Sequence, residues 1–141
     1  MGNQKRLSNS QPEIKSKNNQ VGKIIIVEED LFLSEMYVAK LELEGFEIFL
    51  ASDGEEALDR MRLNKPDLVL LDLLMPKKDG LAVLKEKFND LEIKNIPVIV
   101  LTNLSQKEKI NQCYDLGVKD FLIKAYFIPS EVVRKIRNLI M

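Results

Sequence analysis

The chain has 141 residues, a length that suits one domain with a single core. Its 45% apolar and 30% charged residues are ordinary for a globular protein and exclude a disordered or fibrous chain. The 21 basic and 22 acidic residues leave a net charge of -1, so nucleic acid finds no general electrostatic attraction. With no histidine and one cysteine, Cys113, an intramolecular disulfide, the usual zinc sites and every Ser-His or Cys-His catalytic pair are excluded.

The N-terminal segment, residues 1–22, differs in composition from the rest of the chain. It is rich in Asn, Gln, Ser and Lys and holds four basic residues against one acidic residue. Because it contributes a net +3 to a chain of net -1, the rest of the chain carries a net -4. The apolar surface of this segment is too small to offset the entropy cost of ordering it. We therefore predict a flexible polar tail followed by one domain over residues 23–141.

Membrane insertion and secretion find no support in the sequence. No apolar run approaches the roughly 20 residues of a membrane span. The polar N-terminus also lacks the apolar stretch of a secretory signal. We therefore expect a cytoplasmic protein that makes no membrane contact.

From Lys23 onward, short apolar runs alternate with helical patterns. Continuously apolar runs of strand length are typical of parallel strands covered on both faces. The runs span residues 24–27, 47–50, 68–71, 98–101 and 121–123. Alternation of strands and helices predicts right-handed crossovers and a parallel sheet between two helical layers. The sequence therefore predicts an α/β fold, a three-layer sandwich in which a strand and a helix repeat five times.

The helical patterns also predict where each helix begins, ends and faces the core. Gly45 ends the first, Asp53 with Glu56 caps the second, and Pro129 starts the fifth. The third pattern places Leu81, Leu84, Phe88 and Leu91 on its inner face. The fourth opens at Ser105 with Glu108 and turns Ile110, Cys113, Tyr114 and Gly117 inward.

Polar side chains follow four of the five predicted strands. They are Glu28, Glu29 and Asp30 after the first, Asp72 after the third, Thr102 after the fourth and Lys124 after the fifth. Ligand sites of such sheets lie beyond the carboxyl ends of the strands. If the first and third strands are neighbours, Glu28, Glu29 and Asp72 converge, and carboxylates that converge repel unless a cation lies among them. Mg2+ suits such an oxygen-rich site, whereas Asp30 is assigned to the cap of the first helix.

Lys124 and Thr102 complete a set of groups suited to phosphoryl transfer. Lys124 supplies a fixed positive charge, and Thr102 supplies a hydroxyl that can donate a hydrogen bond. A carboxylate nucleophile such as Asp72, beside Mg2+ and a lysine, can accept a phosphoryl group because the cations neutralise charge on the transferring oxygens.

In four motifs the chain resembles the receiver domain of bacterial two-component response regulators, over roughly residues 23–139. The motifs are IIIVEED (24–30), LVLLDLLMPKKDG (68–80), VIVLTN (98–103) and DFLIKA (120–125). The resemblance implies a flavodoxin-like (βα)5 fold with the strand order 2-1-3-4-5 of the chemotaxis regulator. It further implies that the protein is a phosphorylation switch rather than an enzyme, limited to its own phosphorylation and slow dephosphorylation.

Site roles follow from the same resemblance. Asp72 would accept phosphate from a histidine kinase or phosphotransfer protein, and Thr102 and Lys124 would bind the phosphoryl oxygens. Phe121 would be the aromatic residue that reorients with Thr102 on activation. Mg2+ would be held by Glu28, Glu29, Asp72 and the backbone carbonyl of Leu74.

Three differences from the family pattern favour a rival function. Glu29 and Ala125 stand where the family usually has Asp and Pro, and Asn103 stands where it mostly has a small residue. They suit a scaffold that works without phosphorylation. A phosphatase with Asp72 as nucleophile is a weaker alternative, because position 74 is Leu and no second acid is available to protonate a leaving group.

The position of the fifth helix shapes the expected output. It runs to the C-terminus, so we expect a stand-alone receiver that signals through protein contacts or homodimerisation, without direct nucleic-acid binding. The expected contact surface is the face formed by helix four, strand five and helix five.

Overall fold

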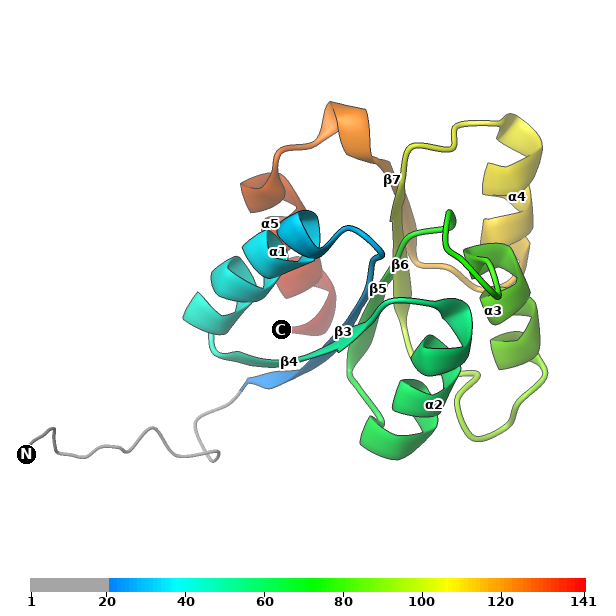
Figure 1. Cartoon of the computed structure of the whole chain (residues 1–141), viewed down its shortest axis with the longest axis horizontal. Helices are drawn as coiled ribbons and strands as arrows, with labels where there is room; N and C mark the ends of the chain where they lie inside the picture. The colour runs from blue at the N-terminus through cyan, green and yellow to red at the C-terminus, as the bar shows by residue number, and fades with distance from the viewer. Residues whose placement is uncertain (1–20) are drawn as a thin grey trace, which may run out of the picture.

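The structure is a computed structural model that describes residues 21–141. Five parallel strands form its centre (Figure 1). They are β3 (Gly22–Val27), β4 (Phe46–Ala51), β5 (Leu68–Leu71), β6 (Val98–Thr102) and β7 (Asp120–Ile123). The spatial order is β4-β3-β5-β6-β7 and every pairing is parallel. The predicted order 2-1-3-4-5 and the flavodoxin-like (βα)5 sandwich are therefore confirmed.

Helices cover both faces of this sheet. They are α1 (Leu31–Leu43), α2 (Gly54–Asn64), α3 (Gly80–Phe88), α4 (Lys107–Asp115) and α5 (Pro129–Ile140), with a short 3-10 helix, η2 (Lys124–Tyr126). Figure 1 shows α1 and α5 on one face and α2, α3 and α4 on the other. Within the part of the chain that the structure describes, no helix is long and apolar enough to span a bilayer.

Alternation along the strands divides the core into two halves. In β3, Ile25 and Val27 pack toward α2 and α3, whereas Ile24 and Ile26 pack toward α1 and α5. Successive side chains of a strand point to opposite faces, so an unbroken apolar run fills both halves. The sheet is thereby fixed on both sides, and its carboxyl edge becomes a rigid base for the loops that follow it.

Helix ends follow the predicted signals in α1 and α2. The Asp30 carboxylate caps α1 by accepting the amide of Leu33 at 3.2 Å, and Asp53 caps α2 by accepting the amide of Glu56 at 2.8 Å. Beyond α1, Gly45 has a φ of 99°, a left-handed conformation that glycine adopts without steric cost. The caps at Asp30 and Asp53 fix where the loops after β3 and β4 end and the helices begin.

Three sequence predictions are wrong in detail. Gly22 belongs to β3 although the predicted tail includes it, and residues 1–20 of that tail lie outside the described residues. On α3 the predicted inner residues Phe88 and Leu91 are 43% and 87% exposed, because the helix ends at Phe88 and Ile93 fills the core instead. On α4 the cap is Gln106, without a side-chain hydrogen bond, rather than Ser105, and Tyr114, predicted to face inward, is 46% exposed.

Lys87 is a buried cation on α3 and predicts a pH-dependent stability. It is 5% exposed, and its Nζ donates to the carbonyl of Lys94 at 2.9 Å. Burial and, to a smaller extent, the positive charge of Lys119 together lower the pKa of Lys87 to about 8. Since an unfolded lysine titrates near 10.4, the unfolded chain binds more protons between these values, so the free energy of unfolding rises with pH there, by about 3 kcal/mol.

Replacing Lys87 by Met is expected to remove this rise and to raise the free energy of unfolding at pH 7. Urea unfolding between pH 7 and 10.5 measures both quantities. Lys85→Met, a change at an exposed position of the same helix, serves as the control and should keep the wild-type pH profile. An unchanged profile in Lys87→Met would contradict the assignment.

Candidate functional site

Strand register brings Glu28 and Asp72 together at the carboxyl edge of the sheet. Val27 and Leu71 are partners at the ends of β3 and β5, so the residues that follow them are neighbours. The ladder continues into the loops, since the amide of Asp72 donates to the carbonyl of Val27 at 3.1 Å. Both carboxylates are buried, Glu28 at 9% and Asp72 at 6% exposure. The predicted convergence of these two acids is thus present.

Lys124, which directly follows the edge strand β7, contacts both carboxylates. Its Nζ lies 2.8 Å from Oε1 of Glu28 and 2.8 Å from Oδ2 of Asp72. β7 lies two strands from β5, a separation of about 10 Å, so the long lysine side chain has to cross the end of β6. The Lys124–Ala125 peptide bond is trans, like all others in residues 21–141, and the lysine still reaches Asp72.

The resulting cluster has a net charge of -1, with one cation between two carboxylates. Burial by itself acts to lower the pKa of Lys124, but its hydrogen bonds to Asp72 and Glu28 and their negative charges prevail, and the pKa ends above its usual value. Lys124 is therefore positively charged at neutral pH. The remaining negative charge makes the cluster attractive to a further cation.

Backbone amides fix the orientation of each carboxylate. The amide of Asp30 donates to Oε2 of Glu28 at 3.1 Å, and the amide of Leu74 donates to Oδ1 of Asp72 at 3.1 Å. The turn after Asp72 closes tightly on α3, where a Cβ at Gly80 would lie 2.7 Å from the carbonyl oxygen of Asp72. Position 80 must therefore be glycine for this turn to keep its shape.

Thr102 and Phe121 lie on the neighbouring strands. Thr102 ends β6, is fully buried, and its hydroxyl accepts the amide of Leu104 at 3.5 Å. Phe121 is half-buried and packs against the core beneath α2, α3 and α4. In the register of β6 and β7, Phe121 lies beside Val100, two residues before Thr102. Thr102 thus lies at the carboxyl edge of the sheet, as the sequence predicts, whereas Phe121 lies within β7, two residues before its carboxyl end.

Glu29 does not join the carboxylate pair. It is exposed, and residues 21–141 contain no group of three or more His, Cys, Asp or Glu side chains placed to hold a metal ion. The expectation that three carboxylates converge is therefore wrong for Glu29 in this structure. The donors fit a hard cation chemically nonetheless, since the buried pair offers carboxylate oxygens and Glu29 offers another on the same turn.

Tyr37 is a site residue that the sequence reasoning missed. It is buried on α1, and it also lines a small cavity with Glu28 and Asp72. Burial raises the pKa of the phenol, while Lys124 lowers it and Glu28 raises it, with a net upward shift. Tyr37 thus stays neutral beside the charged cluster. Helical periodicity carries no signal for this placement.

Comparison with known proteins identifies the family. The family model described as the response regulator receiver domain matches residues 24–137. The DNA-binding dual master transcriptional regulator RpaA of Synechocystis is 32% identical over 118 residues, covering 84% of this chain and 48% of its own length. The chain belongs to the response regulator receiver domain family, and it spans about half the length of the curated relatives it matches.

Two solved structures share the fold and bear on the site. The phosphorylated cyanobacterial phytochrome response regulator RcpA is 32% identical with a TM-score of 0.72, covering 84% of this chain and 90% of its own. The receiver domain of the sensor histidine kinase PA1611 of Pseudomonas aeruginosa is 25% identical with a TM-score of 0.74, covering 84% and 97%. A magnesium ion is coordinated in the active-site cleft of that receiver domain.

Proposed function

We propose that this protein is a phosphorylation switch that accepts a phosphoryl group on Asp72 from a histidine kinase or a phosphotransfer protein. The observation that carries the proposal is the ion pair at 2.8 Å between Lys124 and the buried carboxylate of Asp72. A buried carboxylate at a strand end is costly unless it is paired or used. Membership of the receiver family supports the same function.

The proposed transfer uses the side chains of the cluster in distinct roles. An oxygen of Asp72 attacks the phosphorus, and the bond from phosphorus to the donor nitrogen breaks with its electron pair staying on the donor. The Leu74 amide holds the other oxygen of Asp72, which orients the nucleophile. In this proposal Lys124 neutralises charge on the phosphoryl oxygens, and Thr102 donates its hydroxyl to them.

A divalent cation fits the proposed site. Glu28, Glu29, Asp72 and the carbonyl of Leu74 are the groups that would hold it, and when bound it would neutralise charge on the transferring oxygens. The net charge of -1 on the Glu28, Asp72 and Lys124 cluster favours such binding. The magnesium ion in the solved receiver domain of PA1611 supports Mg2+ as the natural ion.

The proposed output is a protein contact or homodimer through the face formed by α4, β7 and α5. Phe121 lies on β7, so a change at the phosphorylated edge reaches this face through one strand. Curated relatives of the chain are named as transcriptional regulators rather than as enzymes. Because RpaA is named as DNA-binding, the expectation that this chain acts without nucleic acid stays a prediction.

Intact mass after incubation with Mg2+ and a small acyl-phosphate donor tests the proposed function. A switch should gain one stable phosphoryl group, whereas a phosphorylation-independent scaffold should gain none. The phosphatase alternative predicts turnover of the donor without a lasting adduct. The switch is the function expected, and either of the other two results would overturn it.

Substitutions at Glu29 are expected to separate a metal ligand from a surface acid. Glu29→Gln removes the charge that a cation needs, so it should lose Mg2+-dependent phosphorylation, whereas Glu29→Asp should keep it. Titration with Mg2+ followed by NMR measures binding directly. Glu35→Gln, at an exposed acid of α1, is the matched control. If Glu29→Gln titrates like the wild type, Glu29 is not a ligand.

The switch is expected to run from Thr102 to Phe121. A phosphoryl group would draw the Thr102 hydroxyl toward it and leave space for the half-buried Phe121 ring to pack inward. NMR signals of α4, β7 and α5 should then shift on phosphorylation. Thr102→Val, which keeps the shape and removes the hydroxyl, should suppress these shifts. Unchanged signals in the phosphorylated wild-type protein would favour the scaffold.

A further inference from the structure

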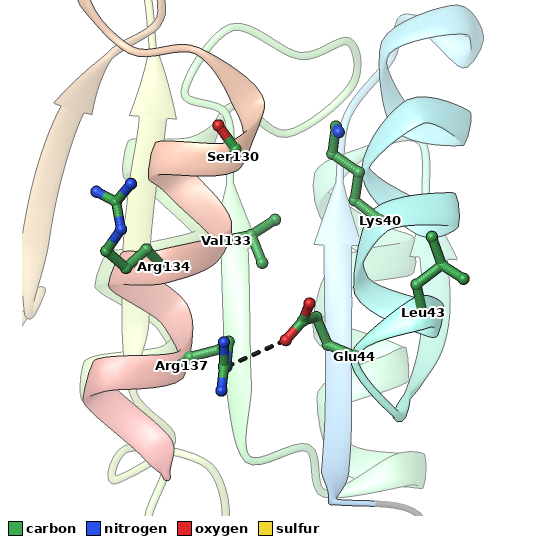
Figure 2. A pocket seen from close by; sticks show the side chains of 7 residues that line it. All are labelled: Lys40, Leu43, Glu44, Ser130, Val133, Arg134 and Arg137. Carbon is green, nitrogen blue, oxygen red and sulfur yellow. Dashed lines mark ion pairs between the residues drawn. The ribbon is translucent and has the colours of Figure 1, made fainter.

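A groove runs between α1 and α5 on the face of the sheet opposite α2, α3 and α4 (Figure 2). Its lining residues come from the C-terminal half of α1 and the first two-thirds of α5; they are Lys40, Leu43, Glu44, Ser130, Val133, Arg134 and Arg137. Figure 2 shows the ion pair between Glu44 and Arg137, 3.1 Å from Nε to Oε1, crossing from one helix to the other. This pair closes one end of the groove and holds the two helices together.

The groove is positively charged although the domain as a whole is negative. Residues 23–141 carry a net -4, whereas the lining has three cations and one carboxylate. Glu44 is engaged with Arg137. Lys40 and Arg134 have no ion-pair partner anywhere in residues 21–141. Within residues 21–141, these two cations of the lining are therefore available to negative charges from outside, and Figure 2 shows Arg134 on the side of α5 that faces away from α1.

An exposed apolar side chain accompanies these cations. Leu43, one turn after Lys40 on α1, is 88% exposed, whereas Val133 on the floor of the groove is only 7% exposed. Figure 2 shows Leu43 on the side of α1 that faces away from α5. An exposed leucine beside unpaired cations suits a ligand that has both acidic and apolar groups. A nucleic-acid backbone suits it poorly, because phosphates would lie against Leu43 and the Glu44 carboxylate.

The charges also disfavour two occupants from the chain itself. A second copy placed symmetrically on this groove would bring Lys40 and Arg134 opposite like charges, which weakens association. The N-terminal segment carries a net +3 and would be repelled in the same way. Charge complementarity thus points to a different, acidic protein.

We propose that the α1–α5 groove docks an acidic amphipathic segment of a partner protein. Acidic side chains of that segment pair with Lys40 and Arg134, and an apolar side chain covers Leu43. This contact does not depend on phosphorylation of Asp72, and it uses a surface separate from the face of α4, β7 and α5.

A labelled peptide made of repeated Glu-Glu-Leu-Leu units, used as the probe with the full chain, tests the proposal. We expect saturable binding by fluorescence anisotropy and NMR shifts at Lys40, Leu43 and Val133. The double substitution Lys40→Glu with Arg134→Glu should weaken binding by about tenfold or more. Leu43→Ser should weaken it as well, because the apolar half of the contact is lost.

Matched controls separate this contact from simple charge attraction. Lys85→Glu with Lys107→Glu makes the same charge change at exposed positions of α3 and α4, and should leave binding unchanged. Polyglutamate and a DNA duplex should bind more weakly than the probe. Equal binding of polyglutamate, tighter binding of DNA, or a probe affinity that the groove substitutions do not alter would each overturn the proposal. So would a Leu43-dependent homodimer in sedimentation that excludes the probe.

Discussion

Replacing Asp72 by Asn is expected to abolish the mass increase that wild-type protein gains from an acyl-phosphate donor. The amide of Asn has nearly the shape of the carboxylate but lacks the charged oxygen that attacks phosphorus. Lys124 would keep Glu28 as a partner at 2.8 Å, so the variant should remain folded. Loss of phosphorylation would then report chemistry rather than unfolding.

The matched control is Asp59→Asn, a carboxylate on α2 whose side chain is 82% exposed. It removes the same charge from the surface and should leave the mass increase intact. Intact mass spectrometry and circular dichroism of both variants, recorded together, distinguish loss of the acceptor from loss of the fold. An adduct that persists in Asp72→Asn would show that another residue is modified.

The sheet was predictable because its information is local. Runs such as 24–27 and 68–71 are apolar at every position, and only a strand covered on both faces buries all of them. The ends of α3 and α4 were less predictable. Leu91 continues the helical spacing of α3, yet the chain turns after Phe88 and a residue of the following loop, Ile93, fills the core. Periodicity shows which face is apolar but not where the helix stops.

The site could be predicted as a set of residues but not as a network. Strand ends place Glu28, Asp72 and Lys124 at one edge, and parallel register makes the two acids neighbours. That Lys124 contacts both of them depends on a side chain crossing a whole strand, which no spacing rule describes. Tyr37 enters the same site from α1. The cations of the separate α1–α5 groove likewise come from helices. Residues brought together only by helix packing leave no pattern along the chain.

Lys124 is expected to be the residue on which the stability of the site depends most. Lys124→Met keeps the length and apolar stem of the side chain but leaves two buried carboxylates without their cation. Removing one partner of a buried ion pair typically costs about 3 to 5 kcal/mol, because the remaining charge stays desolvated. The free energy of unfolding at pH 7 should fall by about that amount. Lys135→Met, which breaks an exposed pair with Asp120 at 3.7 Å, should cost less than about 1 kcal/mol.

Dependence on pH gives the prediction a second signature. In the wild type the raised pKa of Lys124 means that its stabilising contribution is complete at neutral pH and is lost only as the pH rises above the usual lysine range. In Lys124→Met this loss of stability at high pH should be absent, because the titrating lysine is gone. Adding Glu28→Gln to Lys124→Met removes one of the two charges and should recover part of the loss at pH 7. If Lys124→Met unfolds at the same urea concentration as the wild type from pH 5 to 8, the two carboxylates do not need the lysine, and the electrostatic account of this site fails.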